Sequence, residues 1–335
     1  MKNLLYVGNK LSKHGHTATA IEVLGPMLER DGFRVTYASS KKNKLLRLAD
    51  MCLKTFAKSN TVDYVLIDTY STWNFWYAFA VSQLCRLLQL KYIPILHGGN
   101  LPVRLARNPR VCRMVFGHSV VNVAPSGYLA EVFGKAGFRV RQIPNPVGAA
   151  EFRYVRRENL RPKLLWVRSF ASLYNPEMAL RAFKLIQNRY PDAALCMVGP
   201  EKDGLKHKCE EIAAAENLVV TFTGRLSKAE WAAISQQYDI FINTARTDNT
   251  PFSIIEALSL GMAVVSTDVG GIPNLLEDRK NGLLVADDDA SAMADAIVEL
   301  VENTGLASGI IATSKRLIAE STWPNVRAKW LEILI

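Results

Sequence analysis

The sequence has no CxxC pair, no uninterrupted apolar run long enough to cross a membrane, and no GxGxxG fingerprint. Its five cysteines are scattered and lie at no metal-ligand spacing, a pattern typical of reduced thiols in a cytoplasmic protein. The most apolar stretch, residues 73–90, is broken by polar and charged side chains, whereas a spanning helix takes about 20 mostly apolar residues. Residues 1–10 hold too short an apolar run for a signal peptide and are interpreted as a first strand. Because no GxGxxG follows this strand, a Rossmann dehydrogenase is disfavoured.

Positive charge is abundant but confined to one half of the chain. The formal net charge is +10, yet residues 1–150 hold 20 lysines and arginines against 7 acids, while the remainder holds 21 against 24. A bias of this kind suggests that the first half faces something anionic. No nucleic-acid-binding motif accompanies the charge, so no nucleic-acid partner is expected.

Short apolar runs alternate with longer amphipathic stretches along all 335 residues. This alternation predicts parallel sheets covered by helices on both faces, and the length suits two domains of roughly 150 residues each. Six strands are expected in each half, at residues 4–7, 35–38, 64–67, 92–96, 120–123 and 141–143, and then at 164–167, 194–198, 219–222, 240–243, 263–266 and 282–285. We therefore predict an α/β protein of two Rossmann-like, doubly wound domains, residues 1–150 and 160–318, facing each other across a cleft. Ligands of such sheets bind beyond the carboxyl ends of the strands.

The segment 247–273 is the richest in polar residues at such a strand end. It consists of a polar loop that carries Asp248, followed by a helix that is expected to begin near Pro251 and to carry Glu256. The amides of residues 252–255, in the first turn, can bind diphosphate oxygens. The two carboxylates can accept hydrogen bonds from sugar hydroxyls.

This segment resembles the donor site of the retaining glycosyltransferase family 4, also called glycosyl transferases group 1, whose members have the GT-B fold. The family pattern is an acidic residue, seven positions and Glu-Ala, then a glycine, Pro-Val-Val and a Gly-Gly-x-Pro turn. Here it is present as Asp248, Glu256-Ala257, Gly261, Val264-Val265 and Gly270-Gly271-Ile272-Pro273, with Asp for the usual first Glu and Ala263 for the proline.

The resemblance implies a role for each of these residues. Glu256 would hold the ribose hydroxyls of the nucleotide, and Asp248 would hold the transferred sugar. The remaining donor-binding residues of this segment would be Thr250, Pro251, Phe252, Ser253 and Ile254. The shorter Asp248 is a departure from the family at the position that contacts the sugar.

Arg168, at the end of a strand, is a further candidate for the donor site. The family has Gly-Arg here, followed some residues later by a lysine, and the two cations would neutralise the departing diphosphate. Arginine suits phosphate through bidentate contacts. The lysine is missing, so either Tyr174 or Asn175 substitutes by hydrogen bonding, or another cation, Lys202 or Arg246, reaches in.

Two positions in the first half complete the predicted site. Residues 8–17 resemble the glycine-bearing loop of the family, which implies that Gly15 approaches the donor phosphate and the acceptor. His97 ends a strand where the family commonly has a histidine that lines the cleft. By this resemblance His97 serves catalysis together with Asp248 and Arg168, by orienting the substrates or stabilising charge. The alternative is an ordinary polar residue at a strand end.

One acidic run resembles a metal-binding motif. Asp287-Asp288-Asp289 is similar to the DxD of the other glycosyltransferase fold, but it precedes a helical pattern over residues 290–301. Helix capping and dipole stabilisation account for it. No metal and no cofactor are expected, and the nucleotide sugar is a co-substrate.

Residues 41–58 predict a basic helix with Leu45, Leu48, Cys52 and Phe56 on one face. Such a helix can lie on an anionic membrane surface, or it can pack on the sheet as an ordinary amphipathic helix. The charge asymmetry and the aromatic residues between 73 and 77 favour the membrane. We therefore expect a glycan or lipid-linked acceptor, and a cytoplasmic protein placed peripherally on the inner face of the membrane.

The predicted function is a retaining glycosyltransferase that moves a hexosyl group from a UDP- or GDP-sugar, in cell-envelope or extracellular polysaccharide biosynthesis. Residues 1–150 would bind the acceptor and residues 160–318 the donor, with a last helix within 319–335 crossing back to the first domain. One alternative is a noncatalytic nucleotide-sugar-binding protein, which the missing lysine and Asp248 keep open. The other is a GT-B-fold sugar-nucleotide epimerase, which would need further acids for proton transfer.

Overall fold

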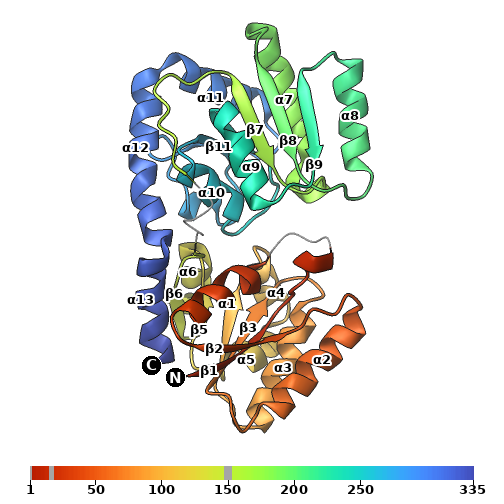
Figure 1. Ribbon diagram of the computed structural model, residues 1–335, viewed down its shortest axis with the longest axis vertical. Helices are drawn as coiled ribbons and strands as arrows, with labels where there is room; N and C mark the ends of the chain where they lie inside the picture. Colours follow the sequence, from red (N-terminus) through yellow and green to blue (C-terminus); the bar gives the residue numbers. More distant parts are fainter. Residues whose placement is uncertain (1, 15–18, 147–152) are drawn as a thin grey trace. The chain divides into compact units, whose positions relative to one another are not determined.

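The computed structural model describes residues 2–14, 19–146 and 153–335. The chain forms two compact units, unit 1 (residues 1–146 and 321–335) and unit 2 (residues 147–320) (Figure 1). Within the described residues each unit has a six-stranded sheet whose paired strands are all parallel. The predicted pair of doubly wound α/β domains is therefore confirmed.

Unit 1 has the strand order β2-β1-β3-β4-β5-β6. Its strands are β1 (Asn3–Val7), β2 (Arg34–Ala38), β3 (Tyr64–Thr69), β4 (Tyr92–Leu96), β5 (Asn122–Ala124) and β6 (Val140–Gln142). Its helices are η1 (Ser12–His14), α1 (Ala20–Arg30), α2 (Lys44–Ala57), α3 (Phe75–Leu87), α4 (Leu101–Arg107), α5 (Pro109–Phe116), α6 (Gly127–Lys135) and α13 (Trp323–Leu334). The order reverses between β1 and β3, so a crevice for ligands is expected at their carboxyl ends.

Unit 2 has the strand order β12-β11-β10-β7-β8-β9, which reverses between β7 and β10. Its strands are β7 (Lys163–Val167), β8 (Ala194–Val198), β9 (Val220–Gly224), β10 (Ile240–Asn243), β11 (Ala263–Thr267) and β12 (Leu283–Val285). Its helices are η2 (Ser172–Tyr174), α7 (Pro176–Arg189), α8 (Leu205–Ala215), α9 (Lys228–Ile234), η3 (Ser235–Gln237), α10 (Phe252–Ser259), η4 (Ile272–Asn274), α11 (Ala290–Glu302) and α12 (Thr304–Ser321).

The predicted strand boundaries are least accurate at one edge of unit 1. The strand expected at residues 120–123 is β5, at 122–124, and the one expected at 141–143 is β6, at 140–142. Val120 and Val121 pack against the core although they precede the strand. Apolar burial therefore extends beyond the hydrogen-bonded ladder, and the hydrophobic pattern alone misplaces the strand.

The C-terminal helix α13 belongs to the core of unit 1. Val326, Trp330 and Leu334 are buried in one cluster with side chains of β1 and α1, such as Leu4 and Leu24. Residues more than 300 positions apart in the sequence thus share one core. No helix among the described residues has the length and apolar character that a membrane span requires.

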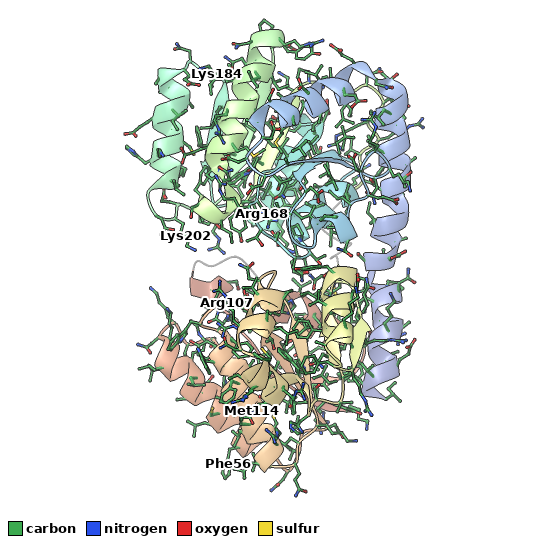
Figure 2. All side chains as sticks on the ribbon, turned by 180° about the vertical axis from the view of Figure 1, so that it is seen from behind. Phe56, Arg107, Met114, Arg168, Lys184 and Lys202 are labelled. Atoms are coloured by element: carbon green, nitrogen blue, oxygen red, sulfur yellow. The ribbon has the colours of Figure 1, made fainter. Side chains whose placement is uncertain are left out.

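Unit 1 exposes large apolar side chains on its helices. Leu45, Leu46, Leu53 and Phe56 of α2 are between 61% and 72% exposed, and Figure 2 shows Phe56 at the surface of the unit. The predicted apolar face was wrong in one member, because Leu48 packs against the core. It flanks the inward face of α2, which is centred on Arg47, Met51 and Thr55.

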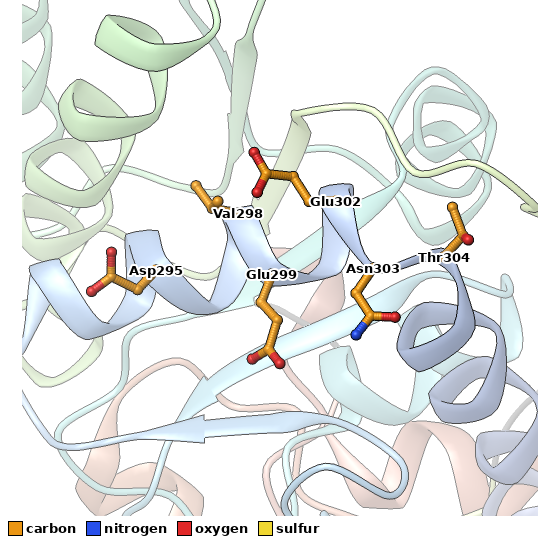
Figure 3. Close-up of a pocket in the computed structure, with 6 residues that line it drawn as sticks. All are labelled: Asp295, Val298, Glu299, Glu302, Asn303 and Thr304. Carbon is orange, nitrogen blue, oxygen red and sulfur yellow. The ribbon is translucent and has the colours of Figure 1, made fainter.

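A surface depression in unit 2 is lined by the last turns of α11 and the start of α12 (Figure 3). Its lining residues are Asp295, Val298, Glu299, Glu302, Asn303 and Thr304. Glu299 and Glu302 are paired with Arg279 and Arg189 at 2.5 Å. Since helices of such sheets run antiparallel to the strands, the end of α11 lies at the edge opposite to the carboxyl ends of the strands.

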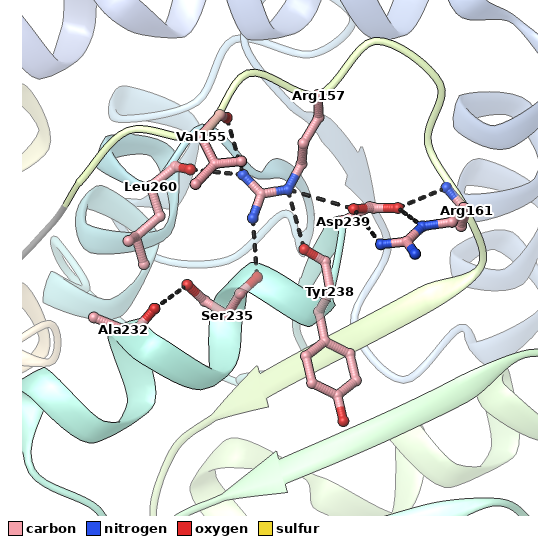
Figure 4. A network of polar contacts seen from close by, with 8 residues as sticks. All are labelled: Val155, Arg157, Arg161, Ala232, Ser235, Tyr238, Asp239 and Leu260. Carbon is pink, nitrogen blue, oxygen red and sulfur yellow. Dashed lines mark hydrogen bonds and ion pairs between the residues drawn. The ribbon is translucent and has the colours of Figure 1, made fainter.

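The segment of unit 2 that precedes β7 is fixed by a buried arginine (Figure 4). Arg157 donates from Nε to the carbonyl of Tyr238 at 3.0 Å, from Nη1 to that of Leu260 at 2.6 Å and from Nη2 to that of Ser235 at 2.9 Å. Asp239 lies 3.5 Å from its Nε. Only 4% of the Arg157 side chain and 7% of the Asp239 side chain are exposed, so the cation compensates both a carboxylate and several carbonyls.

Replacing Arg157 by methionine is expected to lower the free energy of unfolding of unit 2 by about 3–5 kcal/mol, because it leaves the buried carbonyls of Tyr238, Leu260 and Ser235 without their donor. Asp239 keeps its ion pair with Arg161 at 2.8 Å. Urea unfolding measures the change. The neighbouring Arg156 is the matched control, since its side chain is 81% exposed and pairs with Glu158 at the surface. Arg156→Met should change the free energy by at most about 1 kcal/mol, and equal effects of the two variants would contradict the prediction.

Candidate functional site

The reversal of strand order in unit 2 brings two predicted site residues together. Arg168 follows β7, and Asp248 lies in the loop after β10. Arg168 Nη2 donates to Asp248 Oδ2 at 2.7 Å, and Arg168 Nε lies 3.4 Å from Oδ1 of Asn243. The two side chains are 14% and 19% exposed. Arg168 and Asp248 thus form a largely buried ion pair at the edge of the sheet where this fold class binds ligands.

Tyr174 lies beneath the guanidinium of Arg168. The Cζ atom of Arg168 is 5.0 Å from the centroid of the Tyr174 ring, a distance at which a cation and an aromatic ring attract. Thr244 Oγ1 donates to the carbonyl of Tyr174 at 2.8 Å, and Trp166 Nε1 donates to Thr244 Oγ1 at 3.0 Å. Burial raises the pKa of Tyr174, so the ring stays neutral. Tyr174 therefore contacts Arg168 through its ring, whereas the sequence predicted a substitution by hydrogen bonding.

The loop of Asp248 packs on the Gly-Gly turn of the family motif. Gly270 has φ +58, and a Cβ atom there would lie 2.1 Å from the carbonyl oxygen of Asp248. The amide of Gly271 donates to the same carbonyl at 2.9 Å, and Asp248 Oδ1 accepts from the amide of Asn249 at 2.8 Å. The turn needs glycine because any side chain at 270 would displace the loop that carries Asp248.

The first turn of α10 presents polar groups that lack partners. The helix starts at Phe252 after the extended residue Pro251. The amides of Ile254 and Ile255 donate to the carbonyl of Pro251 at 3.2 and 3.4 Å, whereas those of Phe252 and Ser253 precede the first possible intrahelical acceptor. Thr250 and Ser253 are 8% and 7% exposed. Their hydroxyl oxygens have no hydrogen-bond partner among the residues that the structure describes. Buried orphan hydroxyls beside a helix N-terminus are what a phosphate oxygen would satisfy.

Glu256 is paired with a lysine that the sequence did not single out. Lys228 Nζ lies 2.5 Å from Glu256 Oε1, and the two side chains are 29% and 7% exposed. Lys228 is the first residue of α9, which is fixed by a capping box of Ser227 and Glu230. The capping box predicts where the helix begins but not that its first residue meets α10. Lys228 Nζ also lies 5.7 Å from the centroid of the Phe252 ring.

Two of the proposed substitutes for the missing family lysine are engaged elsewhere. Asn175 Nδ2 donates to Asp288 Oδ1 at 2.9 Å, and Arg246 lies 3.6 Å from Asp287 and 3.3 Å from Asp288. The hydrogen bond from Asn175, together with Arg181 and Arg246, lowers the pKa of Asp288 to about 2. These contacts hold Asn175 and Arg246 against the acidic run after β12.

Lys202 is the other substitute named above, and it lies in the exposed loop that follows β8. This loop runs beside the segment after β7, because the amide of Phe170 donates to the carbonyl of Pro200 at 3.0 Å and Phe170 pairs with Glu201. Figure 2 shows Lys202 and Arg168 at the same edge of unit 2.

The acidic run itself serves the helix that follows it. Asp289 Oδ1 accepts from the amide of Ala292 at 2.8 Å, so the predicted helix capping is confirmed. Across the described residues no cluster of three or more His, Cys, Asp or Glu side chains is arranged to hold a metal ion.

In unit 1 the reversal of strand order assembles a second polar cluster around Asp68. His97 Nε2 lies 2.9 Å from Asp68 Oδ1, and the Tyr6 hydroxyl donates to the same oxygen at 3.1 Å. The side chains of His97 and Asp68 are 8% and 0% exposed. Burial, followed by the charge of Asp68, raises the pKa of Tyr6 well above its usual value, so this hydroxyl remains a donor.

The motifs of the sequence assign no role to Asp68. The available signal is an acid that nearly ends the otherwise apolar, fully buried strand β3. Its Oδ2 has no partner within the described chain, and a Cβ atom on Gly8 would lie 2.5 Å from that oxygen. Gly15, the other candidate of unit 1, lies outside the described residues.

Two Rossmann-like units, each with polar side chains at its point of strand reversal, define the GT-B class of architecture. Residues 161–303 match the family model of glycosyl transferases group 1. This match confirms the resemblance that the motifs of this segment indicated.

Curated relatives match part of the chain. A GDP-mannose-dependent alpha-(1-6)-phosphatidylinositol monomannoside mannosyltransferase of Mycobacterium tuberculosis is 26% identical over 201 residues, which are 57% of this chain and 52% of that protein. A phosphatidyl-myo-inositol mannosyltransferase of Mycolicibacterium smegmatis is 27% identical over 157 residues, 46% of this chain and 39% of that protein. The chain thus matches about half the length of these relatives or less.

Solved structures resemble the chain over its full length. Sucrose-phosphate synthase of Thermosynechococcus elongatus has a TM-score of 0.80 at 15% identity and covers 99% of this chain and 98% of its own. Anabaena HepE, in complex with UDP and glucose, has a TM-score of 0.79 at 16% identity and covers 100% of this chain and 99% of its own. At these identities the similarity shows the GT-B fold.

Proposed function

We propose that the protein is a retaining glycosyltransferase that moves a hexosyl group from a UDP- or GDP-sugar to a hydroxyl acceptor. The observation that carries this proposal lies in unit 2, at the carboxyl ends of β7 and β10. There a largely buried Arg168–Asp248 pair adjoins the loop that leads to the helix start with the orphan hydroxyls of Thr250 and Ser253.

Each donor group has a matching partner in this proposal. The diphosphate binds the first turn of α10 and the hydroxyls of Thr250 and Ser253, with Arg168 as the cation. The ribose hydroxyls bind Glu256, whose position Lys228 fixes at 2.5 Å. Asp248 accepts from a hydroxyl of the transferred sugar.

The second cation of the family is supplied by Lys202 in this proposal. Tyr174 supports Arg168, and Asn175 and Arg246 are held by the acidic run. Lys202 is exposed, and a long lysine side chain can move to a phosphate at little cost.

The resemblance to this family implies retention at the anomeric carbon, and we propose a same-face displacement. The bond between the anomeric carbon and the diphosphate oxygen breaks, the bond to the acceptor oxygen forms on the same face, and the acceptor proton passes to the leaving diphosphate. Arg168 and the amides of α10 stabilise the negative charge that develops on the diphosphate. No protein nucleophile is required.

The acceptor is proposed to be lipid-linked, in cell-envelope or extracellular polysaccharide biosynthesis at the inner face of the membrane. Two curated relatives are named for transfer to phosphatidylinositol-based lipids, and the excess of positive charge in residues 1–150 suits an anionic lipid surface. Unit 1 would bind this acceptor, with His97 in contact with it.

A panel of UDP- and GDP-sugars tests the proposal by thermal shift and by sugar transfer to a lipid extract. One donor is expected to raise the melting temperature, because a ligand at about 100 times its Kd adds about 2.7 kcal/mol to stability. Glu256→Gln removes a charged acceptor and should weaken binding of that donor about tenfold or more. Glu277→Gln is the control, since Glu277 is 64% exposed and pairs with Lys280.

The outcomes separate the rival functions. Binding without release or transfer of the sugar would favour a noncatalytic binder, and conversion of one nucleotide sugar into another would favour an epimerase. If no sugar nucleotide binds, or if Glu277→Gln weakens binding as much as Glu256→Gln, the donor site has been assigned wrongly.

A further inference from the structure

The outward face of α2 is apolar along its whole length. Consecutive helical residues are rotated by about 100°, so the positions 45, 49, 52 and 56 follow one line, with 46 and 53 beside it. These residues are Leu45, Ala49, Cys52 and Phe56, then Leu46 and Leu53. The four large side chains among them are 61% to 72% exposed. A helix on the surface of a sheet normally turns its apolar side inward, but α2 also leaves this second apolar face exposed.

The fold holds α2 without using this face. On its inward side Met51 is buried in the core, and Thr55 Oγ1 donates to the carbonyl of Met51 at 2.8 Å. Arg47, which is 6% exposed, donates to the carbonyls of Lys41 and Lys42 and to Oδ1 of Asn9 at 2.8 to 2.9 Å. The outward leucines therefore do not serve the core of the unit.

Basic side chains surround the apolar face at both ends. Lys41, Lys42 and Lys44 precede or begin the helix, Lys58 follows it, and all four are exposed. The acid on the helix, Asp50, is neutralised by Lys54 at 3.0 Å. An apolar stripe with exposed lysines at its ends is complementary to a surface that is negative outside and apolar beneath. A second copy of the chain would bring the same positive charge against it.

We propose that α2 docks unit 1 on an anionic lipid bilayer, with Leu45, Leu46, Leu53 and Phe56 inserted among the acyl chains and the lysines at the level of the headgroups. The helix lies in the plane of the interface and does not span the bilayer. This inference rests on exposure and charge alone and is independent of the proposed transfer reaction, because a protein without that activity would dock in the same way.

Sedimentation with vesicles of phosphatidylcholine, with or without phosphatidylglycerol, tests the docking surface. The native chain is expected to bind the anionic vesicles and to lose part of its affinity as salt rises above about 0.1 M, where the Debye length is about 10 Å. The variant L46S/L53S should bind about tenfold more weakly or worse, since two exposed apolar side chains can no longer be buried. The control L185S changes an exposed leucine of α7 in unit 2, which is 45% exposed, and should bind as the native chain does.

The reaction rate of the Cys52 thiol in the native chain gives a second measure of docking. Cys52 lies on the apolar line and is half-buried, while Cys85, Cys112, Cys196 and Cys209 are buried. Anionic vesicles should slow its reaction with a water-soluble thiol reagent at least about threefold, and phosphatidylcholine vesicles should not, because only the docked face excludes the reagent. Cys52→Ser identifies the reacting thiol.

Three results would overturn the docking surface. The first is equal binding to neutral and anionic vesicles, or none to either. The second is unchanged binding by L46S/L53S. The third is a dimer in light scattering that L46S/L53S dissociates, which would assign the face to a second copy. Donor binding by L46S/L53S, measured by thermal shift, should equal that of the native chain, so failure of docking and failure of the proposed transfer are distinguishable.

Discussion

Replacing Arg168 by methionine is expected to slow sugar transfer about 100- to 1,000-fold in kcat, the usual cost of removing one preorganised group that stabilises developing charge. Asp248 and the ring of Tyr174 hold the guanidinium in place before any ligand binds. The pair therefore needs little rearrangement when the diphosphate leaves. Steady-state kinetics at saturating acceptor give kcat and KM for the donor. Thermal melting checks that the protein remains folded, since Asp248 loses a partner.

Arg246 provides the matched control for this substitution. It is 44% exposed and engages Asp287 and Asp288, so Arg246→Met should leave kcat within about twofold. Lys202→Met should lower kcat in the same direction as Arg168→Met if Lys202 replaces the family lysine. A raised KM for the donor with kcat unchanged in Arg168→Met would show that Arg168 binds the ground state and the transition state equally, and the proposed role in the departure of the diphosphate would be wrong.

The sequence predicted the bounds of α10 more accurately than the contacts between side chains around it. The expected start near Pro251 agrees with a helix from Phe252 to Ser259, and Gly261 of the family motif follows that helix in a left-handed conformation at φ +78. Proline and glycine act here through local backbone sterics. The contact of Arg168 with Asp248 joins residues 80 positions apart. It depends on strand order and loop packing, which no local pattern encodes.

Helical periodicity did not predict which face of α2 packs against the sheet. Spacing shows that residues share a face, but it does not show which face turns to the sheet when both carry apolar side chains. In the structure Met51 and Leu48 pack inward while Leu45 and Phe56 are exposed. Arg47 adds a polar anchor on the inward side, because it donates to Oδ1 of Asn9 at 2.9 Å, beyond the end of β1.

Asp68 is the residue of unit 1 for which the structure predicts the largest loss of activity. We expect Asp68→Asn to lower kcat about 10- to 100-fold, as is usual when a partner that orients a functional histidine is changed. The amide matches the carboxyl in size, which matters because Asp68 Oδ2 lies against Gly8, and the Tyr6 hydroxyl still has an oxygen to donate to. The substitution removes the negative charge of the carboxylate, whose Oδ1 lies 2.9 Å from His97 Nε2. A carboxylate there accepts from Nε2–H and so fixes the tautomer of His97.

The matched control for this substitution is Asp63→Asn, just before the same strand. Asp63 is half-buried, lies 3.8 Å from Lys2 and accepts from the amide of Asn3 at 2.7 Å, a bond that the side-chain oxygen of an asparagine can still accept. This control should leave kcat within about twofold. Nitrogen NMR spectra of protein labelled with ¹⁵N-histidine add a second measurement, the tautomer of His97. This tautomer would not change if Asp68 only stabilised the fold. With the His97 signal assigned by His97→Gln, the native chain should show the Nε2–H tautomer and Asp68→Asn a mixture of both. If Asp68→Asn keeps a single tautomer and loses activity only in proportion to its stability, then Asp68 supports the fold of β3 rather than the orientation of His97.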